Sequence, residues 1–195
     1  RNPPSELKTK LVNQGLKAAK LKKNPSSISI MAALGDPFQP IAVGLLMGAR
    51  ESGREILLGG GCQMLAVLAL ALNEIEQEFR AQFVEKTLIG TTSWLVKESL
   101  GCSEKQNPFI HLMNKVAKHF KINILGLASG YRFSDSSKKV LRDYEMGYIK
   151  EGVGAGALSL LAQIKGLTQK EMIQRCDVEV SNLFKFDNEK TCQGI

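Results

Sequence analysis

The chain has 195 residues, of which 44% are hydrophobic and 23% charged, and this composition excludes a disordered, collagen-like or disulfide-stapled protein. The formal net charge is +7, a value that raises nucleic acid or an anionic membrane as a partner. Seven basic residues and one acidic residue fall within residues 1–23, so residues 24–195 carry a net charge of only +1. We therefore expect no nucleic-acid or membrane partner, because the basicity belongs to one segment.

The first elements alternate between helical and strand patterns. Residues 5–22 repeat apolar side chains at helical spacing and predict an amphipathic helix. The run SISIMAA at 27–33 predicts a short buried strand, and the turn at Gly35-Asp36-Pro37 separates it from a helix over 41–49. Strands are then expected at 55–58, 86–90 and 122–128, with helices at 62–79, 93–97 and 110–120.

The last part of the chain is expected to be helical. Ser134-Asp135-Ser136 can cap a helix that runs to about residue 148, and a glycine-rich turn precedes a small-residue helix over 157–164. Thr168 and Glu171 have the spacing of a capping box, which predicts a final helix, and the polar tail from Asp187 is expected to fray.

Four short apolar strands separated by helices predict an α/β fold, with an open, mostly parallel sheet and helices on both faces in a Rossmann-like three-layer arrangement. Residues 1–23 are expected to form a connecting helix, residues 24–165 the α/β core, and residues 166–195 a C-terminal helix and tail. The terminal helices are candidates for a small helical subdomain.

The cysteines and histidines point to no metal site. The four cysteines form no C-x-x-C pair, and the spacing of the two histidines, His111 and His119, does not suit two ligands on one helix. We expect free thiols in a reducing compartment, no metal and no cofactor. The longest apolar stretch, residues 64–72, is far shorter than the roughly 20 residues of a membrane span, so we expect a cytoplasmic protein.

Ligands of open parallel sheets bind beyond the carboxyl ends of the strands, and this rule selects several loops. Gly59, Gly60 and Gly61 lie between a strand and a helix, where they either form a tight packing turn or contact phosphate. The hydroxyls of the stretch Thr91-Thr92-Ser93 either cap the next helix or bind substrate. For Asp36, the residues alone favour a capping role.

The stretch EGVGAGA places one carboxylate, Glu151, on a glycine turn before a helix packed with small residues. A desolvated carboxylate can have its pKa raised towards the working range of a general base. The alternatives are helix capping and simple solvent exposure.

Four blocks together resemble the C-terminal half of the nicotinate-nucleotide:dimethylbenzimidazole phosphoribosyltransferase family, above all its uncharacterised archaeal and cyanobacterial members. The blocks are GDPFQPIAVGLLMGA at 35–49, ILLGGGCQMLAVLAL at 56–70, IGTTSWL at 89–95 and EGVGAGALSLL at 151–161. The resemblance implies that about half of a full-length member is missing from the chain, which would then be inactive alone.

The resemblance also implies a reaction and a set of residues. In the family, 5-phosphoribose moves from nicotinate mononucleotide to a benzimidazole, without a metal, in a homodimer. The residue that matches the family's general base is Glu151, and the matching substrate-binding positions are Asp36, Gly59, Gly60, Gly61, Thr91, Thr92, Ser93, Gly152 and Gly154.

One departure from the family pattern leaves an alternative open. A lysine that contacts phosphate in the well-described bacterial members aligns here with Ala33 or Leu34. Either another cation replaces that lysine, or the chain belongs to a non-catalytic relative that binds a nucleotide or a corrinoid precursor.

Overall fold

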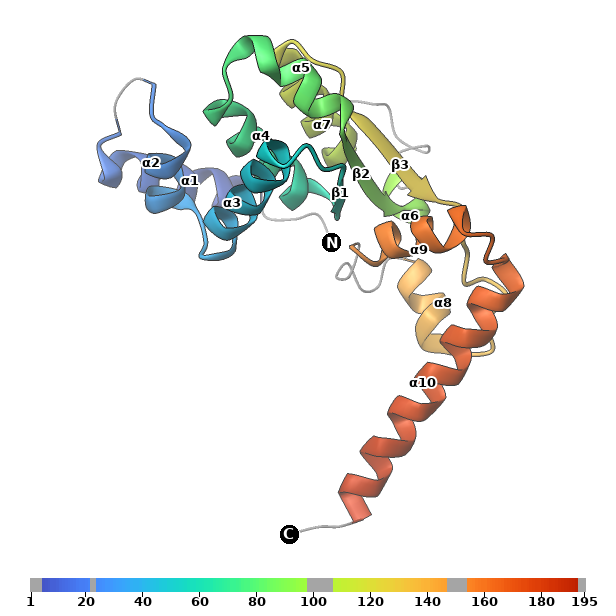
Figure 1. The fold of residues 1–195 in the computed structure, drawn as a ribbon. Coiled ribbons are helices and arrows are strands. Elements are labelled where there is room, and N and C mark those ends of the chain that lie inside the picture. The colour runs from blue at the N-terminus through green and yellow to red at the C-terminus, as the bar shows by residue number, and fades with distance from the viewer. Residues whose placement is uncertain (1–4, 22–23, 98–106, 147–153, 193–195) are drawn as a thin grey trace.

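The computed structural model describes residues 5–21, 24–97, 107–146 and 154–192. Within these ranges it contains a parallel sheet of three strands with helices on both faces, as Figure 1 shows. The strands are β1 (Ile56–Gly59), β2 (Thr87–Thr92) and β3 (Leu125–Ser129), and they lie in the order β1-β2-β3. The predicted open α/β architecture is confirmed.

The register of the sheet brings the carboxyl ends of the strands together. Gly59 of β1 pairs with Gly90 of β2, and Thr92 of β2 pairs with Ser129 of β3. Beyond β1, the backbone N–H of Gly60 donates to the carbonyl of Gly90 at 3.0 Å. The strand ends therefore form one continuous edge.

The strand predicted at 27–33 is wrong, because this segment is the helix α2 (Ser27–Leu34). The Ser26 side chain accepts a hydrogen bond from the N–H of Ser29 and so caps the first turn. Ser27 is fully buried, and its hydroxyl donates to the carbonyl of Leu70 at 2.7 Å. An N-terminal cap and contact with a neighbouring helix outweigh the β-propensity of the two isoleucines.

Helices cover the two faces of the sheet. α9 (Ala155–Ile164) packs on one face, where a Cβ at Gly90 would lie 2.8 Å from Ala157 Cβ. α4 (Cys62–Glu74) and α7 (Pro108–Phe120) cover the other face, on which Met113 lies against Gly126. The core on this side includes the fully buried Leu65, Leu68, Leu72 and Ile89.

The single helix predicted over 62–79 is divided into two. α4 ends at Glu74 and α5 (Gln77–Glu85) begins after Ile75, whose backbone is extended at φ −100° and ψ 132°. Ile75 is almost completely buried, and Arg80 Nε donates to the carbonyls of Leu72 and Ile75, each at 2.9 Å. The buried Ile75 side chain and the Arg80 guanidinium, which donates to the last carbonyls, therefore end α4 without a glycine or a proline.

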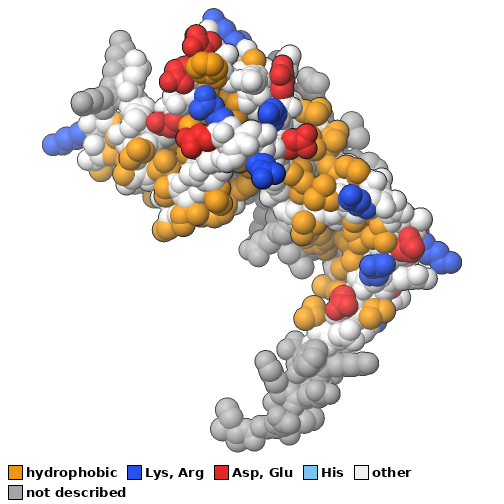
Figure 2. All heavy atoms as spheres, in the orientation of Figure 1, with side chains coloured by type: hydrophobic (Ala, Val, Ile, Leu, Met, Phe, Trp, Pro, Cys, Tyr) orange, Lys and Arg blue, Asp and Glu red, His pale blue; other side chains and the backbone are white. Residues whose placement is uncertain are grey.

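Before the sheet, α1 (Ser5–Ala19) packs on α2, since a Cβ at Gly15 would lie 2.3 Å from Leu34 Cδ2. α3 (Phe38–Glu51) then leads into β1, and α2 and α3 lie beside α4 (Figure 1). Exposed apolar side chains follow the outer face of α3, where Figure 2 shows a hydrophobic patch.

α6 (Ser93–Lys97) follows β2 directly. After the last strand, α8 (Lys139–Glu145) and α10 (Gln169–Cys192) lie on the α9 side. The capping box is confirmed, since Thr168 N–H donates to Glu171 and Glu171 N–H donates to Thr168 Oγ1. The cap predicted at Ser134-Asp135-Ser136 is wrong, because α8 has no side-chain cap and Ser136 instead donates to Asp177 of α10. α10 continues to Cys192 and projects from the sheet (Figure 1), so the polar tail from residue 187 is helical as far as the structure describes it.

Candidate functional site

Three buried hydroxyls mark the carboxyl ends of β2 and β3. Thr91, Thr92 and Ser129 are each 1% exposed, and none of their hydroxyl oxygens has a hydrogen-bond partner among the described residues. A buried polar group without a partner costs about 1–3 kcal/mol. Thr92 and Ser129 pair in the sheet and share one face, where one bound ligand could satisfy both, whereas the Thr91 side chain lies on the opposite face of the same edge.

The first turn of α9 closes against this edge through glycines. A Cβ at Gly156 would lie 2.2 Å from the carbonyl carbon of Thr91 and 2.3 Å from the nitrogen of Thr92. A Cβ at Gly59 would lie 3.2 Å from the carbonyl oxygen of Gly154. Helix backbone and strand backbone meet here without intervening side chains, so only glycine fits at Gly156.

The glycines at 59–61 have distinct surroundings. Gly59 permits the contact with α9, which supports the packing interpretation for this residue. A Cβ at Gly60 would meet only the flexible side chain of Met64, at 2.6 Å. Gly61 is the N-cap of α4, and its carbonyl accepts from the N–H groups of Met64 and Leu65. Among the described residues, no side chain caps the N–H groups at the start of α4, the helix that follows the end of β1.

The thiol at the start of α4 is not activated as a nucleophile. Burial raises the pKa of Cys62, and a backbone hydrogen bond and the positive charge of Lys8 only partly offset this effect. The charge of Lys8, on the basic helix α1, therefore acts at the glycine turn.

The structure describes some of the other predicted site residues and not others. Glu151 and Gly152 lie outside the described residues. Asp36 Oδ1 accepts from the N–H groups of Phe38 at 2.9 Å and Gln39 at 3.1 Å, so its predicted capping role is confirmed. The Ser93 hydroxyl makes a long hydrogen bond of 3.4 Å to the carbonyl of Tyr131.

Ser129 lies in the loop at 128–132, which the rule for parallel sheets also selects, but the sequence does not single this serine out as a site residue. Its loop follows a predicted strand, but nothing in the sequence sets this serine apart from the nearby Ser134, Ser136 and Ser137. Its pairing with Thr92 in the sheet brings it to the site. Arg132, the cation nearest in the sequence, forms an ion pair with Glu145 at 3.0 Å.

No group of three or more His, Cys, Asp or Glu side chains within the described ranges could hold a metal ion. In the same part of the chain, no helix is long and apolar enough to cross a membrane.

The chain is similar to the UPF0284 proteins of cyanobacteria. It is 48% identical over 183 residues to the UPF0284 protein of Prochlorococcus marinus strain MIT 9313, covering 94% of this chain and 45% of that protein. It is 42% identical over 191 residues to the UPF0284 protein of Parasynechococcus marenigrum, covering 94% of this chain and 45% of that protein. It is 36% identical over 171 residues to the UPF0284 protein of a Picosynechococcus species, covering 86% of this chain and 43% of that protein. The chain spans about half the length of these curated relatives. No protein-family model matches it.

Proposed function

We propose that the whole protein is a phosphoribosyltransferase that moves 5-phosphoribose from nicotinate mononucleotide to a benzimidazole-type base. The observation that carries the proposal is the set of buried hydroxyls of Thr91, Thr92 and Ser129 at the strand ends, which have no hydrogen-bond partner among the residues that the structure describes. A ribose phosphate offers hydroxyl and phosphate oxygens that match such groups.

The site requires one proton acceptor. In the proposed reaction a ring nitrogen of the incoming base attacks the anomeric carbon of the ribose, with inversion. The bond to the nicotinate nitrogen breaks, and its electron pair neutralises the pyridinium. The second ring nitrogen of the base loses its proton to the Glu151 carboxylate, three residues before Gly154 at the strand ends.

The phosphate needs positive partners, and two features of the chain could supply them. The first N–H groups of α4 follow the glycine turn directly, and helix N-termini favour anions. The charge of Lys8 acts at Cys62 in the same turn. We propose that these groups replace the lysine that the family pattern has at the position of Ala33 or Leu34.

The test is a turnover assay of the whole protein with nicotinate mononucleotide and a panel of benzimidazoles and adenine, with riboside phosphate detected by mass spectrometry. We expect product from the wild type and from the control Glu78→Gln, and a loss of at least a hundredfold in Glu151→Gln. Absence of product with every base would overturn the proposal. Calorimetric binding without turnover would favour the non-catalytic relative that binds a nucleotide or corrinoid precursor.

We also propose that the protein is a homodimer that associates through α3. Ile41 and Leu45 on this helix are 65% and 70% exposed, and Cβ atoms at Gly44 and Gly48 would meet nothing within 4 Å. Such a face allows two helices to approach closely. Sedimentation velocity should show that the wild type is a dimer and that Leu45→Glu dissociates it. The control Leu183→Glu, on α10, should remain a dimer. A monomeric wild type would contradict the proposal.

A further inference from the structure

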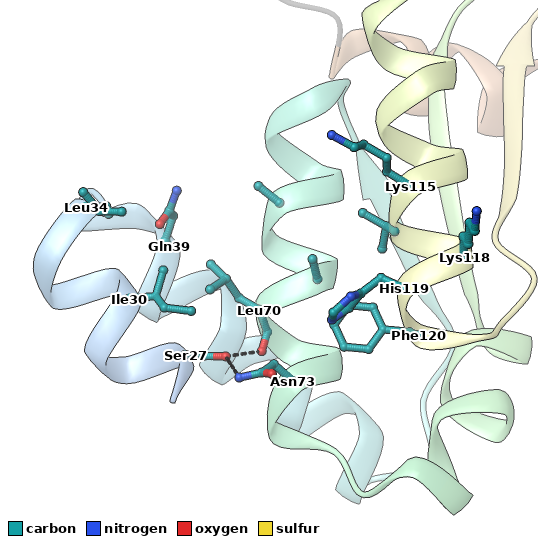
Figure 3. Close-up of a pocket in the computed structure, with 14 residues that line it drawn as sticks. Ser27, Ile30, Leu34, Gln39, Leu70, Asn73, Lys115, Lys118, His119 and Phe120 are labelled. Atoms are coloured by element: carbon teal, nitrogen blue, oxygen red, sulfur yellow. Dashed lines mark hydrogen bonds between the residues drawn. The ribbon is translucent and has the colours of Figure 1, made fainter. Parts of the chain in front are cut away.

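A cavity lies at the opposite end of the sheet from the strand ends. α4 starts beyond the end of β1 and runs back, so its last turns lie near the beginning of the strands, as does the C-terminal end of α7, which leads into β3. Between α2 and α7, with α4 as its floor, is a groove that Figure 3 shows in close-up. We call it the α2–α7 groove.

The groove is mostly apolar and has the size of a small-molecule site. Its volume is about 850 Å³, within the range usual for ligand pockets. Ala66 and Ala69 form a floor of small side chains, Ile30 and Leu34 lie on the α2 side, and Phe120 lies on the α7 side. Alanines on the floor leave room that larger residues would fill.

The charged groups of the groove have one sign. Lys115 and Lys118 line it from the last turns of α7, beside the imidazole of His119, and no Asp or Glu is among the lining residues that the structure describes. None of these three forms an ion pair within the part of the chain that the structure describes. Positive charges beside an apolar surface favour a ligand that combines an anionic group with an apolar body.

The neutral polar groups at the inner end of the groove are already satisfied by one another. The Ser27 hydroxyl donates to the Leu70 carbonyl at 2.7 Å, and Asn73 Nδ2 donates to Ser27 Oγ at 3.2 Å (Figure 3). The cations of α7 are therefore the polar groups that would select a ligand.

We infer that the α2–α7 groove binds an amphipathic organic anion. Its apolar chain or ring system would lie along Ala66 and Ala69, and its carboxylate or phosphate would meet Lys115 and Lys118. This inference does not depend on the proposed transferase activity, because the groove and the strand ends lie at opposite ends of the sheet.

The test uses decanoate as the anionic probe, with decyltrimethylammonium as a cationic probe of the same chain length. Isothermal titration calorimetry should show saturable one-to-one binding of decanoate and none of the cation. The double substitution Lys115→Gln and Lys118→Gln should weaken decanoate binding at least fivefold, and 1 M NaCl should also weaken it, because salt screens exposed charges. The control Lys170→Gln, on α10, should leave the affinity unchanged.

Filling the floor provides an independent test. Ala69→Leu should abolish binding while its circular dichroism and melting temperature remain those of a folded protein. Equal affinity for both probes, or unchanged affinity in Ala69→Leu, would overturn the inference. The inference would also be overturned if decanoate bound the 195-residue chain but not the longer protein that contains it. Another part of that protein would then fill the groove.

Discussion

Replacing Thr92 by valine should stabilise the free protein, although it removes a polar group from the candidate site. Valine has nearly the shape of threonine, and the Thr92 hydroxyl is buried without a partner among the described residues. Removing an unsatisfied hydroxyl recovers its desolvation cost, so we expect a gain of about 1 kcal/mol or more in the free energy of unfolding.

The same strand offers a matched control with the opposite sign. Thr87 is 3% exposed, and its hydroxyl donates to the Phe83 carbonyl at 2.9 Å. Thr87→Val should therefore cost about 1 kcal/mol, the usual net value of a buried hydrogen bond. The two variants should differ by about 2 kcal/mol, or roughly 4–8 °C in melting temperature for a chain of this size.

Urea unfolding followed by circular dichroism measures this difference in the free energy of unfolding. It should appear as a shift of the transition midpoint with an unchanged m-value. If Thr92→Val is destabilised as much as Thr87→Val, then the Thr92 hydroxyl already has a partner in the free protein. The strand-end hydroxyls would then not be available to a ligand, and the reasoning behind the site would fail.

Two further substitutions test the packing around the site and the contact between α8 and α10. Gly156→Ala should destabilise the protein by about 1–3 kcal/mol in urea unfolding, because its Cβ would meet strand backbone; an unchanged free energy of unfolding would contradict the close approach of α9. Burial raises the pKa of Asp177, but hydrogen bonds from Ser136 and Ser137 and the charge of Lys138 outweigh it and leave the pKa below its usual 3.8. Asp177→Asn should therefore lower the melting temperature at neutral pH, and the difference from wild type should shrink as the pH falls below about 4 and through the lowered pKa of the folded state; a difference that does not change with pH in the acid range would refute the assignment.

The parallel sheet was predictable because its strands are short apolar runs followed by glycine or hydroxyl residues and separated by helical patterns. The capping box at Thr168 and Glu171 was equally local, since both partners lie within one turn. Helix α2 was not predictable in this way, because Ser27 is held by Leu70 and Glu74, more than forty residues away. The break after α4 likewise depends on Arg80 reaching back to two carbonyls.

The candidate site was predictable at its loops but not in its contacts. The rule for parallel sheets selects Thr91 and Thr92, because they end a strand. Ser129 joins them only through the register of β2 and β3, and Gly156 is required only because α9 crosses the strand ends. Pairing and packing of this kind depend on distant segments, which local patterns do not encode.

A crystal structure of the longer protein with nicotinate mononucleotide tests the central claim most directly. We expect ribose or phosphate oxygens within hydrogen-bond distance of at least two of the hydroxyls of Thr91, Thr92 and Ser129. Nicotinate mononucleotide bound away from the strand ends, with these hydroxyls still unpartnered, would contradict the proposed site.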